Sequence, residues 1–118
     1  MKVLLTLLAM CFGITALSAS PAKEIEALLA VVTEMKDASF IRNGGSHGGK
    51  EAAAHLRMKW EKQKDKIRTA EEFITLCATK SYLSGERYKI RFKDGSEKFS
   101  SDYFTEELKK LRRKEAKP

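Results

Sequence analysis

An uncharged run near the N-terminus constrains the rest of the chain most. A lysine at the second position is followed by fifteen residues without a charge (3–17) and then by small residues (18–20). A basic start, an apolar segment of about 7–15 residues and a small-residue exit are typical of a secretory signal peptide, whereas a membrane-spanning helix needs about 20 apolar residues. We therefore predict a signal peptide over residues 1–19, cleaved after Ser18 or Ala19. An uncleaved membrane anchor is the alternative.

The remaining 99 residues allow one small domain and one hydrophobic core. They contain one cysteine, Cys77, so no intrachain disulfide can form and the core must be held by packing alone. No second segment is long and apolar enough to cross a membrane. We expect an exported protein, periplasmic or else extracellular, with a single domain over residues 20–118 and a basic tail, about 112–118, that frays into solvent. The oligomeric state stays open.

Apolar residues recur with the period of a helix in several segments. We predict helices from Pro21 to about Met35, from Lys50 to about Gln63, from a Thr69–Glu72 capping box to about Ala78, and from about Asp102 onward. The predicted inward positions are Ile25, Leu28, Leu29, Val32, Met35, Ala52, Ala53, Leu56, Trp60, Ala70, Phe73, Ile74, Cys77, Ala78, Phe104, Leu108 and Leu111.

Residues 87–93 alternate basic and apolar side chains, which predicts a strand with Tyr88, Ile90 and Phe92 facing inward. Asp94-Gly95 predicts a two-residue hairpin turn, after which residues 96–99 return as a short partner. The predicted fold class is therefore α+β, mainly α: three to four amphipathic helices packed with one β-hairpin.

A glycine-rich segment precedes the second helix. Residues 42–49 contain four glycines within six positions, which is unfavourable inside a helix, and we interpret them as a loop whose start is held by Phe40 and Ile41. Backbone N–H groups at the following helix start could cradle an anion. A turn that needs glycine only for positive φ is the alternative.

Two histidines raise the question of a metal or acid–base site. His47, Glu51 and His55 could form a composite site if the glycine-rich segment folds back, although no standard zinc-ligand spacing is present. Cys77 lies on an apolar stripe, where burial makes a thiol inert, so we expect it in the core. We predict no cofactor and no metal, and the interpretation leans away from an enzyme.

Four cations alternate along the predicted strand: Arg87, Lys89, Arg91 and Lys93. Such a face could contact an acidic polymer or anionic lipid, but exposed strand faces commonly carry basic residues to discourage edge pairing. Outward aromatic residues for base stacking are missing, and the predicted export argues further against nucleic acid as a partner.

Several separate blocks of sequence occur together in an order and spacing that resemble one family. They are Phe40–Gly44, His47, Glu51–Ala53, His55–Lys59, Thr69–Ile74, Ser84-Gly85 and Tyr88. The chain resembles the YfeK-like family of small exported bacterial proteins, a domain of unknown function, over about residues 25–111. The resemblance implies export in a bacterium and a single domain, and it supplies no activity, cofactor or catalytic residue. Gly48-Gly49 departs from the expected pattern, which predicts a softer start of the second helix.

The favoured function is a non-catalytic binding or interaction module of the bacterial envelope, with an envelope protein or an anionic envelope ligand as partner. The candidate binding residues are polar groups that neither helix nor strand formation requires: Arg42, Asn43, Gly44, His47, His55 and Arg57. Two alternatives stay open: a small metal-assisted or acid–base hydrolase using His47, Glu51 and His55, and an electrostatic binder of anionic polymer through Arg87–Lys93.

Overall fold

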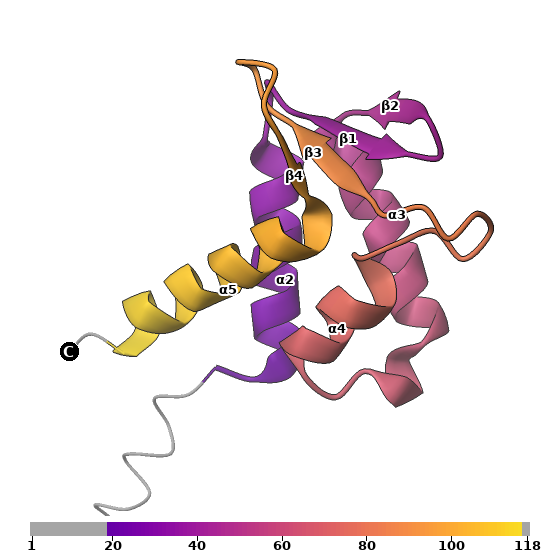
Figure 1. Cartoon of the computed structure of the whole chain (residues 1–118). Helices are drawn as coiled ribbons and strands as arrows, with labels where there is room; N and C mark the ends of the chain where they lie inside the picture. Colours follow the sequence, from indigo (N-terminus) through magenta and orange to yellow (C-terminus); the bar gives the residue numbers. More distant parts are fainter. Residues whose placement is uncertain (1–18, 117–118) are drawn as a thin grey trace, which may run out of the picture.

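Two β-hairpins lie between helices along the chain, one before α3 (Gly49–Lys62) and one after α4 (Ala70–Cys77) (Figure 1). The structure, a computed structural model, describes residues 19–116. Over that range four α-helices, a short 3₁₀ turn and four strands confirm the predicted α+β, mainly α class. In chain order the elements are α2 (Pro21–Glu34), β1 (Ser39–Arg42), β2 (Gly45–His47), α3 (Gly49–Lys62), η1 (Lys64–Lys66), α4 (Ala70–Cys77), β3 (Lys89–Arg91), β4 (Glu97–Phe99) and α5 (Ser100–Ala116).

The four strands form one antiparallel sheet in the order β2-β1-β3-β4 at one end of the helices (Figure 1). The sequence predicted one hairpin, but the glycine-rich segment folds as a second one rather than as an irregular loop. Its turn residues Asn43 and Gly44 have φ values of 53° and 78°. Two positive φ values in succession are what a two-residue type I′ hairpin turn requires, and Asn-Gly is its preferred pair.

The predicted hairpin between β3 and β4 is present, with a turn one residue longer than expected. Phe92 N–H donates to the Ser96 carbonyl (2.8 Å) and Gly95 N–H to the Phe92 carbonyl (2.9 Å), so three residues close the turn. Gly95 adopts a φ of 90°, and the Asp94 carboxylate accepts bonds from both the backbone and the hydroxyl of Ser96. This combination is a three-residue turn with glycine in the left-handed position.

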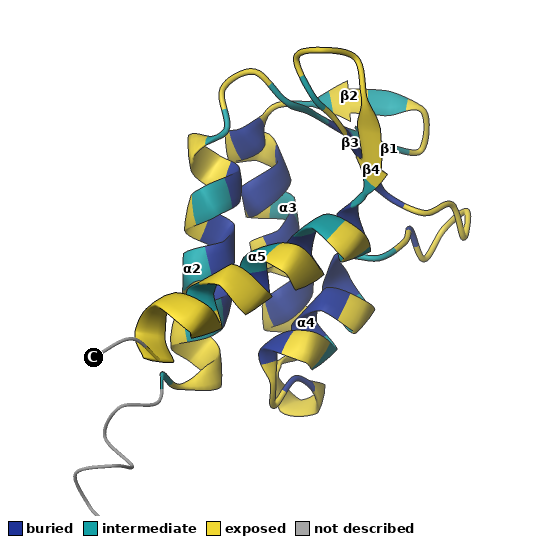
Figure 2. Cartoon of the chain, turned by 60° about the vertical axis from the view of Figure 1, so that its left-hand side comes forward, coloured by how far each residue is buried: buried dark blue, intermediate teal, exposed yellow. Residues whose placement is uncertain are grey.

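The core forms where the predicted helical stripes meet. Figure 2 shows the buried residues on the facing sides of α2, α3 and α4. Trp60 and Phe73 pack edge to face at 6.2 Å, and Ile90 places β3 against the same core. The start of α4 confirms half of the capping box: Thr69 Oγ1 accepts from Glu72 N–H (3.0 Å), while the Glu72 carboxylate accepts from Arg68 N–H instead of that of Thr69.

At Gly49 the start of α3 lies close against the backbone at the end of α2. A Cβ atom there would lie 2.3 Å from the Val32 carbonyl oxygen and 2.9 Å from that of Met35. The missing side chain of Gly49 permits this backbone contact between the start of α3 and the end of α2. A Cβ on Gly48, in contrast, would meet nothing within 4 Å in the described part of the chain.

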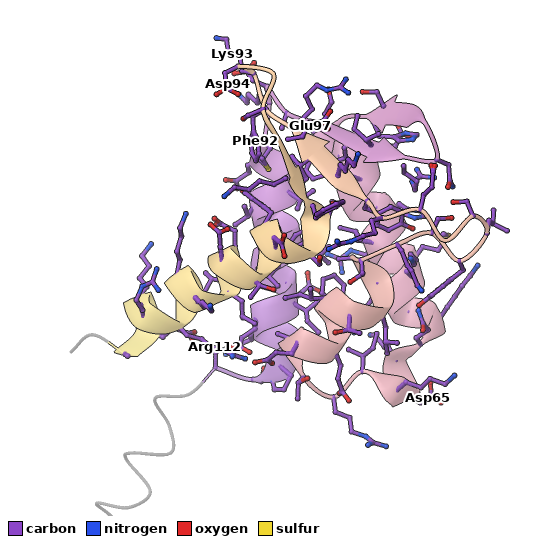
Figure 3. All side chains as sticks on the ribbon, viewed as in Figure 1. Asp65, Phe92, Lys93, Asp94, Glu97 and Arg112 are labelled. Atoms are coloured by element: carbon purple, nitrogen blue, oxygen red, sulfur yellow. The ribbon has the colours of Figure 1, made fainter. Side chains whose placement is uncertain are left out.

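The C-terminal helix is longer at both ends than predicted. It begins at Ser100 and continues to Ala116, so it includes residues 112–116 of the tail that was expected to fray. Arg112 explains the difference, since its guanidinium binds Glu24 on α2 and Glu71 on α4 at distances of 2.6–3.1 Å. Figure 3 shows Arg112 beside the start of α2.

The predicted signal peptide, apart from Ala19, lies outside the described residues. Within residues 19–116, no helix combines the length and the apolar character needed to cross a bilayer.

Candidate functional site

A groove of about 410 Å³ lies between three parts of the molecule. One wall is α3, the second is the β1–β2 turn, and the third is the α4–β3 loop (residues 78–88), which stands out beside α3 in Figure 1. The lining residues are Arg42, Asn43, His55, Met58, Lys59, Lys62, Gln63, Ser81, Tyr82, Leu83 and Tyr88. Three of them are cationic, and none of these lining positions, all within residues 19–116, holds an acidic residue.

Lys59 is the central charge of this groove and is only 6% exposed. Its ammonium donates to the Tyr88 hydroxyl (3.0 Å) and to the Lys80 carbonyl (3.2 Å). It also lies 4.3 Å from the ring centre of Tyr82 and 4.8 Å from that of Tyr88, within the range of cation–π attraction. Burial lowers the pKa of Lys59 below its usual value. In the described chain no carboxylate pairs with it, so the cation is held by neutral groups alone.

His55 lies next to this cation, one turn earlier on α3. Its Nε2 is 3.4 Å from the Tyr88 hydroxyl. Burial lowers the pKa of His55 to about 4, and the nearby charges of Arg42, Lys59 and His47 act in the same direction. The ring is therefore neutral at pH 7 and can share a proton with Tyr88, whose own pKa is raised by burial.

The first hairpin supplies the end of the groove. Arg42 is half-buried at the end of β1 and contributes both to the groove and to a smaller hollow behind it. Asn43 follows in the turn, and its side-chain oxygen accepts a hydrogen bond from the Ser84 hydroxyl. This bond ties the turn to the α4–β3 loop. Gly44 is needed for the turn conformation, so its contribution is to place Arg42 and Asn43.

His47 and Glu51 form one of the contacts that the sequence suggested. His47 Nδ1 lies 2.6 Å from a Glu51 carboxylate oxygen across the start of α3. His47 and His55 line the same small hollow, yet His55 faces Tyr88 instead of completing a ligand set. Among residues 19–116, no group of three His, Cys, Asp or Glu side chains is placed to hold a metal ion together.

Arg57 lies away from the groove. Its guanidinium donates two hydrogen bonds, of 2.7 and 2.8 Å, to the carboxylate of Glu26 on α2. The pair lowers the pKa of Glu26 and raises that of Arg57. Arg57 therefore joins α2 to α3, while the other candidate residues gather at the first hairpin and its neighbouring side of α3.

The four cations of the predicted basic strand face have different surroundings. Arg91 forms an ion pair with Glu97 at 2.7 Å, and Arg87 stacks 3.6 Å over the ring of Phe99. Lys89 lies 5.9 Å from the same ring, and Lys93 is at the tip of the β3–β4 turn (Figure 3). This face is thus partly neutralised and partly stacked.

Cys77 is fully buried, as the sequence predicted. Burial raises the pKa of its thiol to about 11. At pH 7 the thiolate needed for nucleophilic attack is therefore scarce.

Two groove residues, Lys59 and Tyr82, were not among the candidate residues predicted from the sequence. A signal for Lys59 was available, because it lies three residues after Leu56 and directly before Trp60, at the edge of the apolar stripe of α3. Tyr82 carried no such signal, since its role depends on how the α4–β3 loop folds back. Its hydroxyl bonds to the Leu76 carbonyl and to the Gln63 side chain.

Comparison with known proteins agrees with the resemblance seen in the sequence. The model of a family described as "Family of unknown function (DUF5329)" matches residues 19–112. Over 64 residues the chain is 41% identical to "Uncharacterized protein YfeK" of Salmonella typhimurium (strain LT2), a match that covers 54% of this chain and 53% of that protein. The matched region thus spans about half the length of that relative. No solved structure matches the chain. Because the family model covers most of its residues, the chain belongs to the DUF5329 family.

Proposed function

We propose that this protein is an exported, non-catalytic binding module of the bacterial envelope, and that its groove binds a ligand carrying a negative charge. The single observation that carries the binding role is the charge of the groove. Arg42, Lys59 and Lys62 line it, and no acidic residue from the described part of the chain balances them there.

The buried position of Lys59 strengthens this argument. Removing a charge from water costs free energy unless a counter-ion or several hydrogen bonds compensate. Two acceptors and two aromatic rings compensate in part, and an ammonium has three donors, so one donor is left for a ligand. An anion entering the groove would complete the hydrogen bonding of the cation.

Binding is favoured over acid–base catalysis by the state of the titratable groups. His55 is neutral and engaged with Tyr88, His47 is held by Glu51, and Cys77 is inaccessible. His47 and His55 line the same small hollow, but each is engaged by another side chain, and Cys77 lies in the core. On the Arg87–Lys93 face, Arg91 is paired with Glu97 and Arg87 stacks over the ring of Phe99, whereas no acidic lining residue from the described part of the chain balances the cations of the groove.

The export part of the proposal rests on the signal-peptide pattern of residues 1–19. It is tested by N-terminal sequencing of the protein recovered from cell fractions. We expect a periplasmic or extracellular product that begins at Ala19 or Ser20. A protein that keeps Met1 and stays in the cytoplasmic fraction would overturn export and leave the groove argument unaffected.

The binding part is tested in living cells with a photo-crosslinking side chain at Leu83, on the rim of the groove. Lys93 is the matched control, since it is exposed at the β3–β4 turn and lines a different hollow (Figure 3). We expect an adduct at position 83 that disappears in an Arg42→Ala, Lys62→Ala background. Mass spectrometry of the adduct identifies the ligand. Equal adducts at both positions, or an adduct insensitive to the two substitutions, would contradict an anion-binding groove.

A further inference from the structure

Exposed apolar side chains gather at the groove. Among residues 19–116, three large apolar side chains are strongly exposed: Met58 at 44%, Tyr82 at 61% and Leu83 at 95%. All three line the groove. Single exposed apolar residues are ordinary on a protein surface, but a set that shares one concave site marks a place of interaction.

The apolar and cationic groups of the groove come from opposing walls. Met58, Lys59 and Lys62 lie on adjacent turns of α3, while Tyr82 and Leu83 line the groove from the α4–β3 loop. Tyr82 is held in place by its hydroxyl bonds to the Leu76 carbonyl and the Gln63 side chain. The loop is also anchored to the first hairpin through the Ser84–Asn43 hydrogen bond. The apolar wall is therefore built into the folded chain.

We infer that the groove binds an amphipathic anion, a molecule that joins one carboxylate to an apolar chain. The inference deepens the proposed function and rests on it. The carboxylate accepts from the remaining donor of Lys59 and from Arg42, and the apolar chain covers Met58, Tyr82 and Leu83. A volume of about 410 Å³ falls within the usual range for small-molecule sites, about 300–1,000 Å³.

A small inorganic anion fits this groove less well. Phosphate or acetate would reach the cations but leave the three apolar side chains exposed to water, so burial of apolar area would add nothing to the affinity. An acyl carboxylate uses both halves of the site. The C-terminus of a peptide that ends in leucine presents the same chemistry, and the two sources are separated by experiment.

The test is an NMR titration of the purified protein that follows the backbone amides of Asn43, Met58, Lys62 and Leu83. Lys93 serves as the reference outside the groove. The probes are acetate, inorganic phosphate, octanoate, uncharged octanamide, and the tripeptide Gly-Gly-Leu with a free or an amidated C-terminus. We expect octanoate to bind at least tenfold more tightly than acetate and at least tenfold more tightly than octanamide. In the Leu83→Ser variant, octanoate should lose at least threefold in affinity while acetate is unchanged.

Other outcomes separate the two proposals. Equal affinity for acetate and octanoate would overturn the amphipathic ligand and leave the anion-binding groove standing. Equal affinity for octanoate and octanamide would overturn both, since the negative charge would then contribute nothing. A titration in which none of the six probes shifts the groove amides would also overturn both. If free Gly-Gly-Leu outcompetes octanoate, the acyl ligand is replaced by a peptide C-terminus.

Discussion

Lys59 and Tyr88, 29 residues apart, are joined by a buried hydrogen bond of 3.0 Å between the ammonium and the phenolic oxygen. Tyr88 also lies 3.4 Å from His55 Nε2, so one hydroxyl connects the buried cation to the neutral imidazole. The bond links α3 to the start of β3 and thereby fixes the floor of the groove.

The Tyr88→Phe substitution should lower the free energy of unfolding by about 1.5–3 kcal/mol, because a charged donor loses its acceptor while remaining buried. Urea denaturation at neutral pH measures the change. Tyr103→Phe is the matched control, since the half-buried Tyr103 hydroxyl has no hydrogen-bond partner within residues 19–116 and its loss should cost less than about 0.5 kcal/mol. Equal losses in the two variants would show that the Tyr88 hydroxyl contributes nothing specific.

Lys59→Met should keep the fold and abolish anion binding. The substitution retains an unbranched chain of similar length, and replacing a buried charge with an apolar group is often neutral or stabilising. We expect the free energy of unfolding to change by less than about 1 kcal/mol in the same urea experiment. A loss above about 2 kcal/mol would mean that the ammonium is needed for folding, and that its two bonds outweigh its desolvation.

His55 should make the protein less stable as the pH falls. Its folded pKa, about 4, lies below the value of about 6.5 in an unfolded chain, so the unfolded state binds the proton first. The contribution of His55 to the free energy of unfolding is complete above about pH 6.5 and is lost as the pH falls from there to about pH 4. After allowance for the partial exposure of the ring, it amounts to about 1–2 kcal/mol.

His55→Gln removes this dependence, so the stability difference between wild type and variant should shrink as the pH is lowered from about 7 to about 4.5. The carboxylates of Glu26 and Glu71 have lowered pKa values, act in the same direction at lower pH, and cancel in the comparison. A difference that stays constant with pH would contradict a neutral, buried His55.

The helices were predictable because their apolar stripes are regular. The stripe of α2, from Ile25 to Val32, and that of α4, around Phe73, are buried as the period of 3.6 residues implied. The first hairpin was missed because four glycines suggested an irregular loop. The Asn43-Gly44 pair held the information, since both residues adopt the positive φ values that this pair favours.

The candidate site was predictable only in part, because some of its contacts join residues that are far apart in the sequence. Arg42, Asn43 and His55 do meet at one groove, because the hairpin and α3 are close in sequence. Arg57 is paired with Glu26, which lies 31 residues earlier on another helix, and no local pattern encodes that contact. Tyr82 and Tyr88 reach Lys59 only through the path of the α4–β3 loop. Contacts that depend on tertiary packing are not visible in short-range spacing.

Gly49→Ala should destabilise the protein. The new methyl group would lie 2.3 Å from the Val32 carbonyl oxygen, so α2 and α3 must move apart. Overpacking of this kind costs about 1–3 kcal/mol, which thermal or urea denaturation resolves. Gly48→Ala is the control, with an expected change below about 1 kcal/mol, because the added methyl meets no atom of the described chain within 4 Å. Similar losses at both positions would contradict a close approach confined to Gly49.

Arg112 should hold the last turns of α5 against the body of the protein. Its guanidinium reaches Glu24, whose side chain is 10% exposed, and the more exposed Glu71. An exposed ion pair contributes about 0–1 kcal/mol to the free energy of unfolding. Here one guanidinium binds two carboxylates and therefore orders the side chains of both glutamates. The charge lowers the pKa of Glu71, and the pair raises that of Arg112.

We expect Arg112→Ala to lower the free energy of unfolding by about 0.5–1.5 kcal/mol at low salt, and by less at about 1 M salt, where charges are screened. Hydrogen exchange of the amides at residues 109–116 should become faster, because these turns lose their tether to α2 and α4. Arg113→Ala is the matched control: the neighbouring arginine is exposed and has no ion-pair partner within residues 19–116. If the two variants exchange at the same rate, helix propensity rather than the Arg112 network holds the C-terminal turns in place.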